Sequence, residues 1–141
     1  MVIGIVGHEA TKFTSETEAA ARELIQDLLA PDDSVLVSGH CHLGGIDIWA
    51  EEIAGKLGRE GRIFSPKRLN WLDGYKPRNQ QIAKASDIVH VIVVRTLPAS
   101  YTGMRFEGCY HCRTADHVKS GGCWTAKYAQ RLGKSAEWHV V

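Results

Sequence analysis

The spacing of hydrophobic residues along the chain predicts alternating strands and helices. Short apolar runs, rich in β-branched residues, predict buried strands at residues 2–6, 34–38, 62–65, 88–94 and 136–140. Between them, apolar residues recur at helical spacing and predict helices that start near Ser15, Ile46, Pro77 and Thr125. The run at residues 88–94 is apolar on both faces, which is typical of a central strand in a parallel sheet.

Local signals refine the ends of these elements. Ser15 followed by Glu18 has the form of a capping box at a helix start. Pro77 fits the first helical position, where a missing N–H costs nothing. Residues 66–76 are predicted to form a loop, and its aromatic residues, Trp71 and Tyr75, either cover the core or stack on a base.

The alternation of strands and helices predicts an α/β fold. We expect a doubly wound, Rossmann-like sheet of five parallel strands, in the order 3-2-1-4-5, with helices on both faces. Residues 1–141 are predicted to form one domain. In such a sheet a ligand binds at the carboxyl ends of the strands, here beside the first and fourth strands, where the strand order reverses. Gly7, His8 and Glu9 follow the first strand and are expected to reach that crevice.

Composition narrows the class of protein. Hydrophobic residues make up 44% of the chain and charged residues 23%, as in a globular domain. The formal net charge of +1 gives no general electrostatic reason to bind nucleic acid, although basic residues gather in residues 56–78. No stretch approaches a membrane span and the first ten residues do not resemble a signal peptide, so we expect a cytoplasmic protein with reduced cysteines and no membrane partner.

The segment CYHCRTADHVKSGGC has the ligand types and spacing of a small zinc site. Cys109, Cys112, His117 and Cys123 form the pattern C-x2-C-x4-H-x5-C, which resembles a retroviral-type zinc knuckle with one extra residue. His111 competes with His117 as the fourth ligand, and four thiols without metal are the simpler alternative. We therefore predict a zinc-binding insertion at residues 101–123, between the fourth strand and the last helix.

Two glycine-rich turns have the composition of phosphate-binding loops. The first, SGHCHLGGID at residues 38–47, joins a predicted strand to a helix, where free N–H groups and the helix dipole favour an anion. Within it His40, Cys41 and His42 are adjacent, so they point in different directions and would chelate one ion poorly; a nucleophilic Cys41 is a further alternative. The second turn, SGGCWT at residues 120–125, shares Cys123 with the zinc pattern.

Three segments together resemble the SLOG superfamily of Rossmann-like nucleotide-binding domains, which includes the LOG phosphoribohydrolases and DNA-processing protein A. They are the turn at residues 38–47, the segment PRNQQI at residues 77–82 and the turn at residues 120–125. The resemblance covers the chain apart from about 20 residues around the cysteines. It implies a nucleotide ligand and a homodimer. With the predicted topology, it places these residues at the ligand: Gly7, His8, Gly39, His40, Gly44, Gly45, Asp47, Arg78, Asn79, Gly121, Gly122 and Thr125.

The sequence departs from the hydrolase branch of that superfamily. Tyr128 stands where the hydrolases carry a glutamate, and Trp124 stands where their loop carries glycine. We therefore expect binding of a nucleotide or a nucleotide-derived molecule. The first alternative is hydrolysis of a nucleotide N-glycosidic bond, with Glu9, Asp47 and Arg78 as candidate catalytic residues. The second is a nucleic-acid-binding module that uses the zinc knuckle and the basic face.

Overall fold

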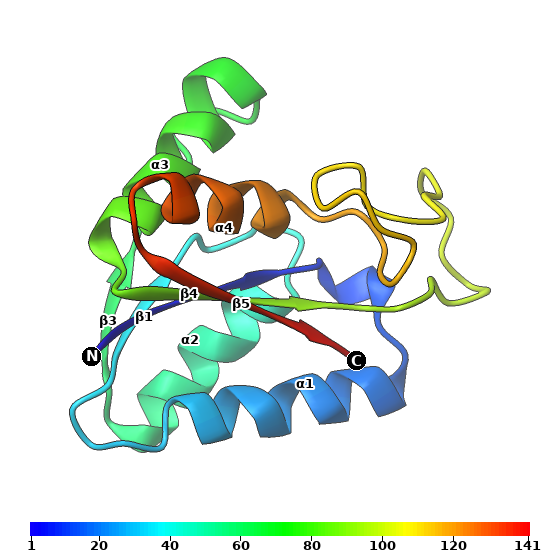
Figure 1. Cartoon of the computed structure of the whole chain (residues 1–141). Coiled ribbons are helices and arrows are strands. Elements are labelled where there is room, and N and C mark those ends of the chain that lie inside the picture. Colours follow the sequence, from blue (N-terminus) through cyan, green and yellow to red (C-terminus); the bar gives the residue numbers. More distant parts are fainter.

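The computed structural model describes all 141 residues and consists of one five-stranded, all-parallel sheet between two layers of helices (Figure 1). The strand order is β3-β2-β1-β4-β5, which confirms the predicted fold class and order. None of the helices combines the length and the apolar character needed to cross a lipid bilayer. The strands are β1 (Val2–Gly7), β2 (Val35–Ser38), β3 (Glu60–Ile63), β4 (Ile88–Val93) and β5 (Ser135–Val140).

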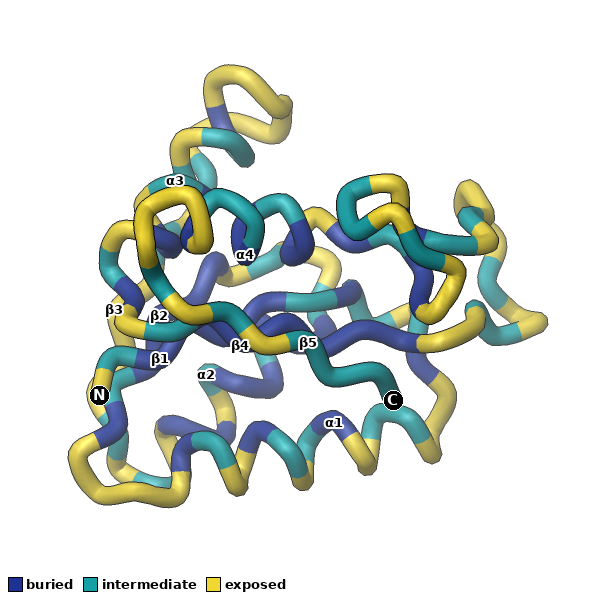
Figure 2. The backbone as a smooth tube through the Cα atoms, viewed as in Figure 1, coloured by how far each residue is buried: buried dark blue, intermediate teal, exposed yellow.

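The helices divide between the two faces of the sheet. Helices α1 (Ser15–Leu28) and α2 (Ile46–Leu57) cover one face, and α3 (Lys76–Ala85) and α4 (Gly121–Arg131) cover the other (Figure 1). Each face has its own buried cluster: Ile92 of β4 packs with residues of α1 and α2, and its neighbour Val91 packs with residues of α3 and α4. Figure 2 shows this buried centre along the strands.

Two helix starts differ from the sequence predictions. Helix α1 is capped by Thr14, whose hydroxyl accepts from Thr17 N–H at 3.1 Å while the Thr17 hydroxyl accepts from Thr14 N–H at 2.8 Å. The predicted box at Ser15 and Glu18 is therefore one residue too late. Helix α4 begins four residues before the predicted Thr125, because the Ser120 hydroxyl accepts from Gly122 N–H at 3.0 Å and caps a first turn of poor helix formers.

Strand β3 and the loop after it also differ from expectation. The strand covers Glu60–Ile63 rather than 62–65, and all four of its residues are exposed. Its position follows the hydrogen-bond ladder with β2 rather than a hydrophobic pattern. Within the expected loop, Trp71–Tyr75 forms a π-helical turn, in which Tyr75 N–H donates to the carbonyl of Asn70, five residues earlier, at 2.8 Å.

Residues 94–120 connect β4 to α4 at the carboxyl ends of the strands (Figure 1). Two hydrogen bonds hold this segment against the sheet and against itself: Val118 N–H donates to the Val94 carbonyl at 3.0 Å, and Lys119 N–H donates to the Gly108 carbonyl at 2.9 Å. Because α4 begins at Gly121, the predicted insertion at 101–123 includes the first turn of that helix.

Candidate functional site

The four predicted metal ligands come together. The sulfur atoms of Cys109, Cys112 and Cys123 and a ring nitrogen of His117 all lie within 4.8 Å of one another. Cys123 Sγ and His117 Nε2 are 3.6 Å apart. A tetrahedral ion bound at ordinary zinc–sulfur and zinc–nitrogen lengths would set these two atoms about 3.6 Å apart. The group could therefore hold a metal ion without large rearrangement.

The chain builds this cluster from a tight turn and a helix start. Cys109 N–H donates to the Thr114 carbonyl at 2.9 Å, and Thr114 N–H donates back to the Cys109 carbonyl at 3.2 Å. Arg113, at φ 54°, closes the turn in the left-handed region. The turn brings Cys109 and Cys112 to one side, and α4 supplies Cys123 from its first turn.

The structure separates the two histidines that compete for the fourth ligand position. His117 is buried and belongs to the cluster, whereas His111 does not belong to it and lines a neighbouring cavity instead. A residue between the two cysteines of C-x2-C usually points away from the metal, and the absence of His111 from the group agrees with this. His117, and not His111, therefore belongs to the group that could hold a metal.

A buried indole supports the presence of a charged group at the sulfur atoms. Burial raises the pKa of the Cys112 and Cys123 thiols, so without a cation they stay neutral. Trp138 Nε1 is buried without a hydrogen-bond partner. The indole packs against the buried cluster that contains Cys123, and it opposes the rise in the pKa of that thiol. A metal-bound thiolate would accept this N–H, as outer-sphere donors do at metal sites. The donor set and this unpaired N–H both fit a bound divalent cation.

Beside the cluster lies a cavity of about 680 Å³ at the carboxyl ends of the strands. The end of β1, the start of α2, the first turns of α3 and α4 and the 94–120 segment all contribute to its walls. This is the position expected for a doubly wound sheet. Of the residues predicted to bind a ligand, those that line the cavity are Gly7, His8, Asp47, Arg78, Asn79, Gly121, Gly122 and Thr125.

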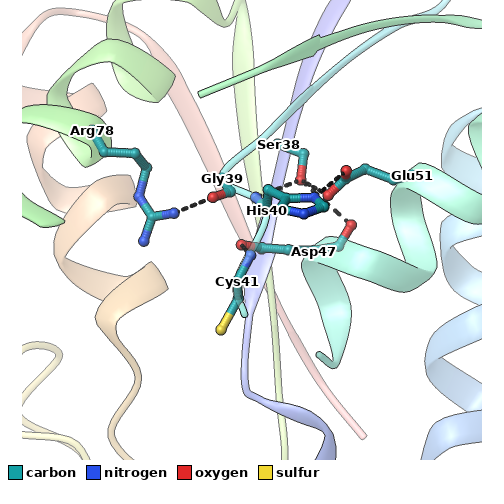
Figure 3. Close-up of polar contacts among 7 residues, drawn as sticks. All are labelled: Ser38, Gly39, His40, Cys41, Asp47, Glu51 and Arg78. Carbon is teal, nitrogen blue, oxygen red and sulfur yellow. Dashed lines mark hydrogen bonds and ion pairs between the residues drawn. The ribbon is translucent and has the colours of Figure 1, made fainter. Parts of the chain in front are cut away.

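The remaining predicted ligand residues, Gly39, His40, Gly44 and Gly45, do not line the cavity. His40 turns away because its backbone is left-handed at φ 51°, and its Nδ1 lies 2.7 Å from a carboxylate oxygen of Glu51 (Figure 3). Gly45 is needed for packing, since a Cβ there would lie 2.3 Å from the His8 carbonyl oxygen. These residues shape the turn rather than the cavity wall.

Several N–H groups of the 38–47 turn are paired within the protein. Cys41 N–H donates to Asp47 Oδ2 at 3.1 Å, and Ile46 N–H donates to the His8 carbonyl at 3.1 Å. Gly44 N–H donates to the Cys41 carbonyl at 3.0 Å. This turn therefore offers a phosphate fewer backbone donors than the glycine pattern predicts. Burial also raises the pKa of the Cys41 thiol, which argues against a nucleophilic Cys41.

Arg78 crosses from α3 to the turn after β2. Its Nη1 donates to the Gly39 carbonyl (Figure 3). Its Nε donates to Asn79 Oδ1 at 2.8 Å. The guanidinium also lies over the Tyr75 ring at 5.7 Å. These contacts hold the charged group at the cavity wall and leave Nη2 without a partner in the chain. A cation held in this way suits recognition of an anionic ligand.

Two carboxyl groups line the cavity. Burial at the start of α2 raises the pKa of Asp47 to about 6, although the nearby Arg78 opposes the shift. Glu9 lies two residues after β1, and its Oε1 accepts a long hydrogen bond of 3.5 Å from the Tyr101 hydroxyl. Asp47 can thus hold a proton close to neutral pH.

His8 lines the cavity but uses both ring nitrogens within the fold. Val94 N–H donates to Nδ1 at 3.1 Å, which leaves Nε2 to donate to the Lys119 carbonyl at 2.9 Å. Burial lowers the pKa of His8 to about 4, so the ring is neutral. His8 therefore joins β1, β4 and the 94–120 segment, and has no free nitrogen for a ligand.

Sequence reasoning missed most of the aromatic and lysine residues of the cavity. Trp71 and Trp124 meet edge to face, with ring centroids 4.9 Å apart, and Trp124 stacks on Tyr128 at 5.4 Å. The two tryptophans line the cavity together with Lys12, Tyr75, Tyr110 and Lys119. Two features of the sequence could have indicated cavity residues. Trp124 replaces an expected glycine in SGGCWT, and Tyr110 lies between two predicted metal ligands.

Fold and site define a Rossmann-like α/β domain with a Cys3His group that could hold a metal. Among solved structures, the chain is similar to the X-ray structure of DNA processing protein A (DprA) from Streptococcus pneumoniae, with a TM-score of 0.55 and 17% sequence identity. The similarity covers 96% of this chain and 49% of that one, so the chain spans about half its length. At this identity the likeness shows the fold alone. No family model and no curated protein matches the chain.

Proposed function

We propose that the protein binds a nucleotide or a nucleotide-derived small molecule in the cavity, and that a structural zinc ion in the Cys3His cluster supports the cavity wall. The composition of that wall carries the proposal. The side chains of Lys12, Arg78 and Lys119 bring positive charge, and the rings of Trp71 and Trp124 bring flat apolar surface. Cations complement phosphate, and aromatic rings complement a base.

The start of α4 is the best place for a phosphate group. Gly121 N–H has no partner within the chain and lies at the positive end of the helix dipole. Gly122 brings this helix start close to β1, since a Cβ there would lie 3.0 Å from Val6 Cγ2 and 3.1 Å from Gly7 N. The SGG sequence therefore allows the helix start to form part of the cavity wall.

Zinc is the ion that the cluster fits best. Three cysteine sulfurs and one imidazole are a common structural zinc set, and softer ligands favour zinc over magnesium or calcium. Four protein ligands leave no coordination position for a substrate, so we assign the ion a structural role. Its ligand Cys123 lies in the same turn as the proposed phosphate donors.

Mass spectrometry and calorimetry test the proposal. Native spectra of the purified protein, followed by denaturing spectra, should report one zinc ion and a co-purified nucleotide. Titration with AMP, ADP, ATP, adenosine and inorganic phosphate should then show binding of the phosphorylated nucleosides, weakened at least tenfold in Arg78→Ala. Arg131→Ala, at the exposed end of α4, is the matched control and should bind like the wild type. Absence of nucleotide binding to the zinc-loaded protein would refute the proposal.

Hydrolysis of a nucleotide N-glycosidic bond is the second candidate, because Asp47 has a pKa of about 6 and faces the cavity together with Glu9. A carboxylic acid that holds its proton near neutral pH can protonate a leaving base. Release of free base from nucleoside monophosphates, measured for the wild type, Arg78→Ala and Asp47→Asn, separates the two. If the wild type releases free base and both variants do not, the proposed function is hydrolysis rather than binding alone.

A nucleic-acid role is less well supported. Within the basic segment 56–78, Arg59 is used internally, donating to the Leu29 carbonyl at 2.9 Å and to the Ala30 carbonyl at 2.7 Å. Arg62 pairs with Glu60 at 3.3 Å. The segment therefore presents less free positive charge than its sequence suggests. Salt-dependent binding to single strands that is lost with the zinc would revive this alternative.

A further inference from the structure

A second group of metal-type ligands lies on the opposite face of the sheet from the Cys3His cluster. His90 of β4 and Glu137 and His139 of β5 bring two ring nitrogens and a carboxylate oxygen within 4.8 Å of one another. The sequence does not reveal this group, because His90 and Glu137 are 47 positions apart and only the strand register joins them. We propose that the three side chains bind a first-row divalent transition ion such as zinc.

The register of the two edge strands creates the group. His90 is paired with Glu137 along β4 and β5, and His139 follows two residues later, so all three side chains emerge on one face. That face is the one covered by α1 and α2, since Ile92, two residues after His90, packs there. Trp138, between Glu137 and His139, packs on the other face, against the buried cluster that contains Cys123.

The distances between ligand atoms fit one ion. His90 Nδ1 lies 2.9 Å from His139 Nε2 and 3.6 Å from Glu137 Oε2, and His139 Nε2 lies 3.9 Å from the same oxygen. If an ion lay about 2.1 Å from each ligand atom, two such atoms would be about 3.0 Å apart at a ligand–metal–ligand angle of about 90°. They would be about 3.4 Å apart at the tetrahedral angle. The observed separations lie on both sides of these values, so small side-chain rotations would bring all three ligand atoms to bonding distance of one ion.

A simple hydrogen bond does not account for the whole group. One neutral ring can donate to the other across the 2.9 Å between His90 and His139. The Glu137 oxygen, however, is too far from both nitrogens for a hydrogen bond, yet it faces them. An ion between the three atoms would use all of them.

The site would be open to exchange. His90 is almost fully buried, whereas the side chains of His139 and Glu137 are 23% and 59% exposed. Three protein ligands leave at least one coordination position for water or an external ligand, unlike the closed Cys3His set. Two imidazoles and one carboxylate suit zinc and its neighbours in the first transition row rather than magnesium or calcium. The two sites thus differ in chemistry and in accessibility.

Titration with Zn²⁺ tests this inference on the full chain that already carries the metal of its Cys3His cluster. Calorimetry should detect uptake of one further ion per chain, weakened at least tenfold in Glu137→Gln and in His139→Gln. Both residues are partly exposed, so these variants should keep the wild-type melting temperature in the absence of added metal. His42→Gln and Glu60→Gln replace exposed residues outside the group and serve as matched controls that keep the uptake.

Cobalt substitution gives an independent readout. The first equivalent of Co²⁺ bound to metal-free protein should show the sulfur-to-metal absorption of a thiolate site, and the second should not. In Cys109→Ser the thiolate absorption should weaken while uptake at the second site remains. Wild-type protein that takes up no further Zn²⁺, or uptake that is equal in Glu137→Gln, His139→Gln and wild type, would overturn the inference.

Discussion

Cys123 and Trp124 are consecutive residues in the first turn of α4, and they serve two different features of the protein. Cys123 is buried in the Cys3His cluster, whereas Trp124 lines the cavity. The same arrangement recurs in the turn at residues 109–112, where Tyr110 and His111 line the cavity between two of the cysteines. The Cys3His cluster therefore lies directly behind one wall of the cavity.

Replacement of Cys109 by serine should release the metal and weaken ligand binding together. The Cys109 side chain does not line the cavity, so any loss of affinity must be an indirect effect of a change in the cavity wall beside the cluster. We expect metal content to fall below half an equivalent and nucleotide affinity to fall at least about tenfold, which corresponds to about 1.4 kcal/mol. Elemental analysis and calorimetry measure both.

Cys41→Ser provides the control for metal content, because Cys41 lies outside the cluster. It should retain a full equivalent of metal. If Cys109→Ser loses its metal but binds nucleotide as tightly as the wild type, the cluster and the cavity are independent.

Trp124→Ala should weaken nucleotide binding more than phosphate binding. Stacking of one base on an aromatic side chain contributes about 1–3 kcal/mol, so nucleotide affinity should fall between about fivefold and 150-fold. Inorganic phosphate has no base and should bind the variant as it binds the wild type. Equal losses for phosphate and nucleotide, measured by competition calorimetry, would show that Trp124 shapes the helix start rather than contacting a base.

Asp47→Asn should stabilise the protein increasingly as pH rises. The folded pKa of Asp47, about 6, lies above its ordinary value of 3.8 because burial disfavours the charged carboxylate. The folded chain therefore binds this proton more tightly than the unfolded chain. The resulting contribution to the free energy of unfolding is fully present below about pH 4 and is lost as pH rises through 6.

The difference in unfolding free energy between Asp47→Asn and wild type should thus grow by about 3 kcal/mol between about pH 4 and pH 8, because each unit of pKa shift corresponds to about 1.36 kcal/mol. Asparagine keeps an oxygen acceptor for Cys41 N–H. Urea titrations across this range measure the difference. Asp32→Asn, at a fully exposed residue, is the matched control for the loss of a carboxyl group.

Gly45→Ala should destabilise the protein far more than Gly58→Ala. Both glycines have positive φ, but only a Cβ at residue 45 would collide with backbone, at 2.3 Å from the His8 carbonyl oxygen. Residue 58 ends α2 in open space, so alanine there should cost roughly 1 kcal/mol, against roughly 3 kcal/mol or more at residue 45. Thermal melts of the two variants compare them, and equal losses would contradict the packing role of Gly45.

Hydrophobic patterning was sufficient to predict the sheet because its central strands are buried on both faces. The run from Ile88 to Val93 shows this most clearly. Patterning misplaced β3, whose four residues are exposed and whose position depends on hydrogen bonds to β2. It also placed the start of α4 too late, since two glycines conceal a helix that Ser120 caps. At the start of α4, capping by Ser120 outweighs the weak helix propensity of the two glycines. In β3, pairing with β2 determines the position of a strand that has no hydrophobic pattern.

The Cys3His cluster could be predicted from spacing because its four residues lie within 15 positions of one another. The cavity could be predicted only in part. The direction of the His40 side chain depends on its left-handed backbone conformation, which the sequence does not predict. The meeting of Trp71 with Trp124 joins two segments 53 residues apart, and the His90 group depends on strand register. Such contacts follow from the completed fold rather than from any local pattern.

The alternation of side chains along β5 has a consequence for the order of assembly. The Cys3His ligands are close in sequence, so their loop can close around an ion at little entropic cost before the sheet is complete. Trp138 reaches the Cys123 sulfur, and Glu137 and His139 reach His90, only once β5 has docked beside β4. Docking of this last strand in chain order should therefore slow metal release from one face of the sheet and create the ligand group on the other.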